Sequence, residues 1–178
     1  LLTLYLKPVL PQLAQQVEAF LNIGTLQWAD SKHTLANHRI NPDAAIVAWT
    51  SLPVGVVTLA ERFDGRNVTD HSFEAMVASV QDLLAPFEAA HRFRERLSGR
   101  PVHLLGTSGT VTTIAGILLG LPRYDRNQVD GIWLKVPEIE QITARLLGQS
   151  YDQRIAEPCI GRERADLVLA GCAILEAI

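Results

Sequence analysis

Apolar residues recur with a helical period in several separate segments of this chain. The longest such segment begins at Thr69 or Asp70, either of which can cap a helix, and ends in a charged tail from Arg92 to Arg96. A kink is expected at Pro86. The inward-facing stripe of this predicted helix consists of Phe73, Met76, Val77, Val80, Leu83, Leu84 and Phe87.

Four further segments have the same period. A short helix is predicted over 12–21, behind Pro11, and an uncharged, buried helix over 111–119. A third begins at Pro137 and ends at Gly148, and the last, rich in Ala and Leu, covers 163–178.

Short apolar runs between these helices predict strands. They are residues 44–50, 101–105 and 131–134, and a second element follows the first strand at 56–63. Glu61 and Arg62 at its end either pair across a cleft or simply end a strand, and the structural role is the preferred interpretation. Residues 22–43 keep neither period and stay unassigned. Alternating strands and helices indicate an α/β domain with helices packed on the sheet.

The composition and net charge of the chain exclude several classes of function. The chain has 178 residues and a net charge of -3, so no basic field exists to gather nucleic acid or an anionic membrane. No run approaches the length of a membrane-spanning helix. Cys159 and Cys172 are too few for a disulfide scaffold, which favours the cytoplasm, and both are expected to be inert, with Cys172 in the core. The first residue, Leu1, and the last, Ile178, indicate a piece cut from something longer.

The sharpest local feature is the sequence Gly106-Thr107-Ser108-Gly109-Thr110 between a predicted strand and a helix. Two glycines, three hydroxyls and a helix N-terminus converge there, which suits phosphate oxygens. The string lacks the Lys of a P-loop and the third glycine of a dinucleotide fingerprint. A plain turn that caps a helix is the alternative.

Four segments together resemble the exopolyphosphatase and guanosine pentaphosphate phosphohydrolase (Ppx/GppA) family. Residues 106–115 resemble its second phosphate loop, and Thr50 to Phe63 resemble its Ser-Leu-Pro-x-Gly segment. Tyr124-Asp125 with Val129-Asp130-Gly131 follows in the family's order, and 160–171 resemble its Arg-Ala-Asp helix. The resemblance runs from about Ala45 to Ile178.

This resemblance implies an actin-like fold (the ASKHA, ribonuclease H-like class) with helices on a mixed sheet, in which two related domains close over a phosphate chain and Mg²⁺. Residues 44–178 would be the second domain, and 1–43 an unassigned, truncated N-terminal segment. The family's Asp-x-Gly-Gly-Gly-Ser loop, its catalytic Glu and its first domain are not found in this sequence, so the catalytic residues and metal ligands stay unknown. Little activity is expected of this chain alone.

Other polar residues have two interpretations each. His103 precedes the loop and can contact a ligand or simply pack in a strand. Arg162 and Arg164 face the interdomain cleft in the family, or else belong to an exposed ion-pair network with Glu163 or Asp166. His33 and His38 invite a metal site with Asp30, but a solvated loop is the better interpretation.

Three functions therefore compete. The first is part of a hydrolase that cleaves terminal phosphoanhydride bonds of polyphosphate or of guanosine pentaphosphate (pppGpp), with this chain supplying one phosphate-binding loop. The second is an ATP-dependent kinase of the same superfamily, for which no adenosine pocket is found. The third is a non-catalytic actin-like domain that acts in interaction or as a homodimer.

Overall fold

The computed structural model describes residues 15, 18, 47–100 and 102–178. The chain divides into two compact units, Leu1–Trp49 with Arg126–Trp133, and Thr50–Asp125 with Leu134–Ile178. Gln15 and Glu18 have helical backbone, as expected for 12–21, whereas the rest of that helix and the unassigned 22–43 segment lie outside the described residues. The predicted division at residue 43 stays a prediction.

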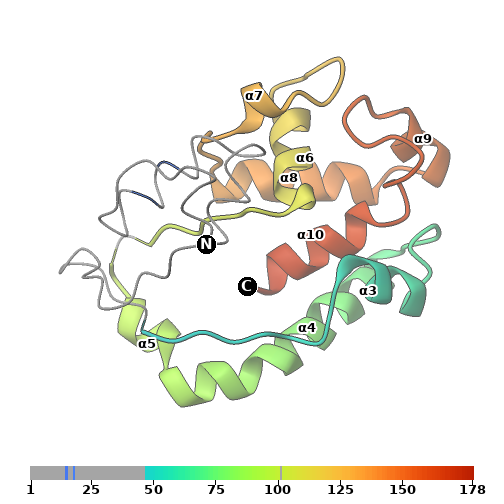
Figure 1. The fold of residues 1–178 in the computed structure, drawn as a ribbon. Helices are drawn as coiled ribbons and strands as arrows, with labels where there is room; N and C mark the ends of the chain where they lie inside the picture. Colours follow the sequence, from blue (N-terminus) through green and yellow to red (C-terminus); the bar gives the residue numbers. More distant parts are fainter. Residues whose placement is uncertain (1–14, 16–17, 19–46, 101) are drawn as a thin grey trace, which may run out of the picture. The chain divides into compact units, whose positions relative to one another are not determined.

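The second unit is built from helices (Figure 1). In the first unit, besides Gln15 and Glu18, the described residues include a short helix, α7 (Arg126–Val129). The helices of the second unit are α3 (Val56–Arg62), α4 (Asp70–His91), α5 (Phe93–Leu97), α6 (Gly109–Leu118), α8 (Val136–Leu147), α9 (Tyr151–Ala156) and α10 (Val168–Ala177).

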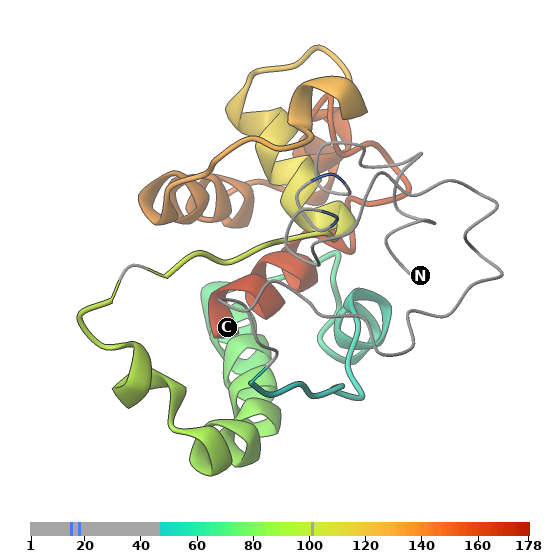
Figure 2. The same ribbon diagram turned by 60° about the vertical axis from the view of Figure 1, so that its left-hand side comes forward.

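Helix α10 is the centre of the second unit. It packs against α3, α4, α6 and α8, and Figure 2 shows it beside α4 from a second direction. Leu169, Ala170 and Ala173 are completely buried, as are Met76 and Val80 of α4. Small side chains let helices approach closely, so the Ala-rich sequence of α10 suits a helix surrounded by others.

The structure confirms the long helix and its cap. Thr69 is the N-cap, and its hydroxyl accepts a hydrogen bond from the Ser72 N–H at 3.2 Å. The helix continues through Pro86 to His91 and ends at Arg92, whose φ of 53° is left-handed. Helix α5 then begins in a new direction.

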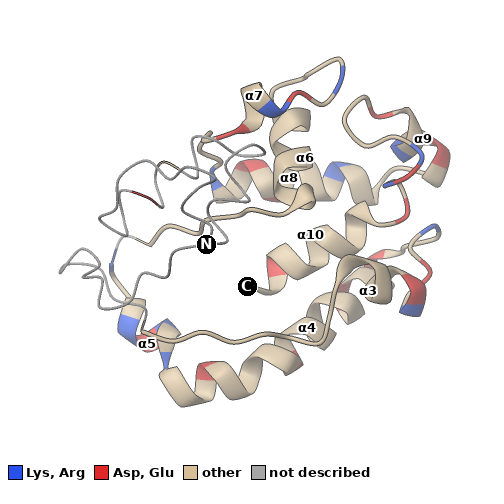
Figure 3. Cartoon of the chain, viewed as in Figure 1, with Lys and Arg blue, Asp and Glu red and all other residues tan. Residues whose placement is uncertain are grey.

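The two helices predicted after the phosphate loop and after the third strand are also confirmed. Helix α6 carries no charged residue, as Figure 3 shows, and its second half is buried. Helix α8 has Pro137 in its first turn and Gly148 as its C-cap. The Glu138 carboxylate accepts a hydrogen bond from the Lys135 N–H at 2.8 Å, which fixes the start of α8.

Of the predicted strands, the described parts 47–50, 102–105 and 131–134 are not strands, and residues 44–46 and 101 lie outside the described residues. Within 47–100 and 102–178 no strand is present, so the mixed sheet is not confirmed. Residues 102–105 are irregular, and Val102, Leu104 and Leu105 are 56%, 64% and 60% exposed. An apolar run becomes a strand only when a neighbouring strand pairs with its N–H and C=O groups, and none does so among the described residues.

The element over 56–63 is a helix rather than a strand ending in Glu61 and Arg62. The Gly55 N–H donates to Thr58 Oγ1 at 3.1 Å, which caps the first turn of α3. Leu59 and Ala60 are buried. Arg62 has a structural contact, because its guanidinium donates to Ser79 Oγ of α4 at 3.2 Å.

The last helix begins at Val168 and not at Glu163. Residues 161–167 form successive turns, in which the Arg164 N–H donates to the Gly161 carbonyl and the Leu167 N–H to the Arg164 carbonyl. The Ala165 carbonyl accepts from Arg154 Nε at 3.0 Å. A long-range contact therefore uses a backbone group that a continuous helix would have kept for itself.

Arg154 joins three segments of the second unit. Its side chain is 1% exposed and donates to the carbonyls of Gln149, Ala165, Gly65 and Arg66 at 2.7 to 3.2 Å. Burial lowers the pKa of Arg154, against the smaller opposing effects of Tyr151 and Asp166. Backbone oxygens thus take the place of a carboxylate as partners of this buried guanidinium.

Within the described part of the chain, no helix has both the length and the hydrophobicity to cross a membrane.

Candidate phosphate-binding site

The loop predicted to bind phosphate is the N-terminus of α6. Ser108 is the N-cap, with extended backbone, and its hydroxyl accepts a hydrogen bond from the Val111 N–H at 3.4 Å. Thr112 Oγ1 lies within 3.4 Å of the Ser108 carbonyl and 3.2 Å of the Gly109 carbonyl, to which it can donate. The first turn of α6 is therefore held by its own side chains.

Three N–H groups remain available at this helix end. Among the described residues, the N–H groups of Ser108, Gly109 and Thr110 donate no hydrogen bond. Thr107, Ser108 and Gly109 are exposed, and Thr110 is half-buried. Exposed N–H groups at the positive end of a ten-residue helix are suited to an anion.

The two glycines of the loop, Gly106 and Gly109, have different surroundings. A Cβ on Gly106 would lie 2.7 and 2.8 Å from the two methyl carbons of Val111, so packing explains that glycine. A Cβ on Gly109 would meet nothing within 4 Å. Neither packing nor a left-handed backbone requires glycine at 109, where a side chain would stand in the open space beside the available N–H groups.

Helix α10 and the turn before it fix the position of α6. Gly171 lies directly against the Thr110 side chain. The Arg164 guanidinium donates to Thr113 Oγ1 at 3.4 Å and lies 5.9 Å from the centre of the Tyr124 ring. The structure thus brings Arg164 to the loop helix, where it contacts the second turn and not the loop itself, and its role as a cleft residue stays a prediction.

The other two predicted cleft residues are less closely connected to the loop. His103 lies in the exposed 102–105 segment just before Gly106, and Arg162 is exposed in the 161–167 turns. Within the described residues, no carboxylate lies within ion-pair distance of Arg162 or Arg164. The alternative of an ion-pair network with Glu163 or Asp166 is therefore not observed there.

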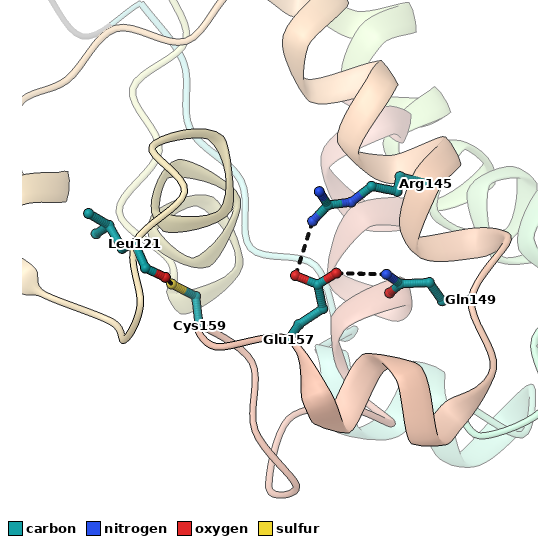
Figure 4. Close-up of polar contacts among 5 residues, drawn as sticks. All are labelled: Leu121, Arg145, Gln149, Glu157 and Cys159. Atoms are coloured by element: carbon teal, nitrogen blue, oxygen red, sulfur yellow. Dashed lines mark hydrogen bonds and ion pairs between the residues drawn. The ribbon is translucent and has the colours of Figure 1, made fainter.

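Glu157 and Cys159, just past α9, contact two different neighbours (Figure 4). The Glu157 carboxylate accepts from Arg145 at 3.0 Å and from Gln149 at 2.7 Å, which ties the end of α9 to α8. The Cys159 thiol contacts the carbonyl of Leu121, just past α6, at 3.6 Å. Burial, and secondarily Glu157, raises the pKa of Cys159, so this thiol is packed and neutral. Cys172 is also buried, as predicted.

A magnesium site is not found among the described residues, since no three His, Cys, Asp or Glu side chains lie together in a way that could hold a metal ion. Asp30, His33 and His38 lie outside the described residues.

Sequence reasoning missed Arg154 and Thr113. Thr113 is buried and receives Arg164 from 51 residues away. No local pattern marks such a pair. A buried Arg in a short helix likewise resembles an ordinary surface residue in sequence.

Comparison with known proteins gives two kinds of match. A crystal structure described as an exopolyphosphatase-like protein is similar with a TM-score of 0.60 and 27% identity, over 72% of this chain and 38% of that chain. Methionine–tRNA ligase from Herminiimonas arsenicoxydans is 63% identical over 43 residues, and that from Vesicomyosocius okutanii is 62% identical over 37 residues. The match to the first ligase covers 24% of this chain and 6% of the ligase, and the match to the second covers 21% of this chain and 7% of the ligase.

The sequence profile of the Ppx/GppA phosphatase family matches residues 40–178. That range contains α6 with its loop and all the helices of the second unit. The resemblance seen in four short segments is thereby confirmed, and the chain belongs to the Ppx/GppA phosphatase family.

Proposed function

We propose that this chain is part of a phosphatase that hydrolyses terminal phosphoanhydride bonds of inorganic polyphosphate or guanosine pentaphosphate, and that it supplies one phosphate-binding loop. Membership of the Ppx/GppA family supports the reaction class. The observation that carries the proposal at the level of residues is the set of available N–H groups of Ser108, Gly109 and Thr110.

The loop would stabilise the negative charge of a bound phosphate. Each oxygen of a terminal phosphate can accept hydrogen bonds, and hydrogen bonds to a charged acceptor contribute about 1.5 to 3 kcal/mol each. Ser108 and Thr110 add hydroxyls on either side of Gly109. Donors held in place before the reaction stabilise the charge that develops on the phosphate oxygens as the bond breaks.

Hydrolysis also requires a carboxylate to take a proton from water, and that residue is not identified in this chain. We propose that it belongs to a first domain of the same fold, which also contributes the metal ligands. The exopolyphosphatase-like structure extends well beyond the part matched here, which supports a further domain. Action in the cytoplasm stays a prediction.

A substitution at Gly109 tests the loop. Gly109→Val places a branched side chain beside the N–H groups, and because its Cβ would meet no protein atom within 4 Å, we expect the fold to be kept. We expect calorimetric titration with inorganic tripolyphosphate and Mg²⁺ to show binding by wild type and at least about tenfold weaker binding by the variant.

Gly55→Val is the matched control. Gly55 also stands at a helix N-terminus, has nothing within 4 Å of an added Cβ and has an extended φ of -144° that valine adopts readily. This control should bind as wild type does. If a folded wild type shows no binding, or if both variants lose it equally, the loop is not a phosphate site.

A second candidate is the non-catalytic interaction domain, which the exposure of Val102, Leu104 and Leu105 favours. It predicts a stable homodimer that does not bind polyphosphate. Sedimentation of the purified chain at several concentrations tests for this dimer. The first proposal requires phosphate binding but does not depend on a dimer.

The ligase matches are best assigned to the residues that precede the family match. Two unrelated families are not expected to share high identity on the same residues. The match of 37 residues is short enough to fit within the 39 residues that precede the family match, and the match of 43 residues exceeds that segment by only four. We propose that the chain joins a ligase-like segment to the phosphatase domain. Deletion of residues 1–39 should then leave tripolyphosphate binding unchanged, and its loss would contradict this assignment.

A further inference from the structure

Gly171 occupies a buried position within α10 where the backbone does not require glycine. Its N–H donates to the Leu167 carbonyl at 3.0 Å, as in a regular helix, and its φ is not in the left-handed region. Alanine favours a helix more than glycine does, and alanines stand at 170 and 173 of the same helix. The reason for glycine at 171 therefore lies in what packs against it.

The side chain that packs against Gly171 is Thr110 of the loop. A Cβ on residue 171 would lie 2.1 Å from Thr110 Oγ1, 2.8 Å from its Cγ2 and 2.9 Å from its Cβ. Rotation of the Thr110 side chain to another staggered position would not relieve this clash, because its Cβ stays in place during the rotation. The backbone of α6 or of α10 would have to move.

The first turn of α6 can move more easily than α10. Helix α10 packs against α3, α4, α6 and α8, and its residues 168–173 are all buried. Thr107, Ser108 and Gly109, in contrast, are exposed. Non-bonded carbon atoms prefer separations of about 3.5 Å or more, so relief of the closest contact needs a shift of roughly 1 Å.

A shift of this size would displace the available donors. The N–H groups of Ser108, Gly109 and Thr110 belong to the same turn as the Thr110 side chain. Hydrogen bonds from N–H to oxygen keep their heavy atoms about 2.7 to 3.2 Å apart, which leaves little tolerance for such a shift. Donors stabilise charge well only when they are held in place beforehand.

We infer that Gly171 is a positioning residue for phosphate binding. Its missing side chain lets Thr110 lie against the backbone of α10, which holds the N–H groups of the loop where a phosphate can accept from all of them. This inference rests on the proposed function, because it assigns a residue of another helix to the geometry of the same site. Gly171 itself does not touch the ligand.

The experiment is a calorimetric titration of the full 178-residue chain with inorganic tripolyphosphate and Mg²⁺. Gly171→Ala should bind at least about tenfold more weakly than wild type, which corresponds to the loss of one hydrogen bond to a charged acceptor. Thr110→Ala removes the two closest atoms, so Gly171→Ala should cost less affinity in that background, where a contact of 2.9 Å remains.

Val80→Ala is the control for a general loss of stability. Val80 is completely buried in α4, so its truncation destabilises the core outside the loop helix. The folded control should bind tripolyphosphate as wild type does. Circular dichroism at the temperature of the titration checks that each variant is folded. If Gly171→Ala does not fold, the double variant should still bind at least about twofold more weakly than Thr110→Ala alone.

Failure of this inference and failure of the proposed function give different results. If Gly109→Val weakens binding but a folded Gly171→Ala binds as wild type does, the loop stands and the role of Gly171 is overturned. That role is also overturned if Val80→Ala weakens binding equally, if Gly171→Ala costs the same with Thr110 and with alanine at 110, or if the double variant matches Thr110→Ala when Gly171→Ala does not fold. If wild type does not bind tripolyphosphate, both proposals fail.

Discussion

Gly171 of α10 lies so close to Thr110 of α6 that no side chain fits between them. A Cβ built on Gly171 would be 2.1 Å from Thr110 Oγ1 and 2.8 Å from its Cγ2. Thr110 belongs to the predicted phosphate loop, and Gly171 belongs to the most buried helix of the second unit. The position of the loop is therefore set by a glycine that is distant from it in the sequence.

Gly171→Ala should destabilise the protein although it lies within a helix. Alanine in place of glycine favours a helix by about 1 kcal/mol, whereas overpacking of a core costs about 1 to 3 kcal/mol, so the clash with Thr110 decides the sign. Urea unfolding should show a net loss in the single variant. The double variant with Thr110→Ala removes the two closest atoms, Oγ1 and Cγ2, and leaves Cβ at 2.9 Å, so it should recover part of the loss. Equal losses in the two variants would contradict the contact.

The ends of several helices could be predicted from the sequence because they depend on the backbone preferences of single residues. Thr69, Pro137 and Gly148 mark helix ends through their own backbone preferences, and the structure places them there. Ser108 and Gly109 likewise define the start of α6. The family resemblance added the expected ligand class, which helix-end signals alone do not specify.

The rest depends on partners that sequence spacing does not reveal. The apolar run at 102–105 has the composition of a strand but no neighbour among the described residues, so its composition predicted the wrong element. Residues 163–167 have helix-forming composition, yet Arg154 takes the Ala165 carbonyl into a tertiary contact. Both differences arise because the hydrogen-bond partners of a backbone segment depend on residues distant in sequence, which are missing for 102–105 among the described residues and present for Ala165.

Arg154→Met should cost about 3 kcal/mol or more of unfolding free energy. Methionine keeps an apolar stem in place of the arginine methylenes but removes the guanidinium. The carbonyls of Gln149, Ala165, Gly65 and Arg66 then lose their donor in a buried environment. Arg145→Met is the matched control, because its ion pair with Glu157 at 3.0 Å is half-exposed and contributes at most about 1 kcal/mol. Chemical denaturation of both variants measures the difference, and similar losses would contradict the role of Arg154.

Gly65→Ala should also be strongly destabilising. The added Cβ would lie 2.0 Å from the Asp166 carbonyl oxygen, a backbone atom that cannot move without displacing the 161–167 turns. We expect a loss of about 2 kcal/mol or more. Gly55→Ala, where a Cβ meets nothing, should change stability by less than about 0.5 kcal/mol. Thermal unfolding monitored by circular dichroism compares the two, and a neutral Gly65→Ala would show that the loop relaxes freely.

Cys172 should make the protein less stable as the solution becomes alkaline. Burial raises the pKa of this thiol from 9.0 to about 11, with Thr143 opposing and Glu176 adding to the shift. Above pH 9 the unfolded chain releases the thiol proton while the folded chain keeps it. The folded state then binds more protons, so stability is full below pH 9 and falls as pH rises toward 11, by about 2 kcal/mol. Urea unfolding at pH 8 and pH 10.5 should show this loss in wild type and in Cys159→Ala, but a smaller loss in Cys172→Ala. Equal losses in all three proteins would mean that other groups cause the alkaline destabilisation.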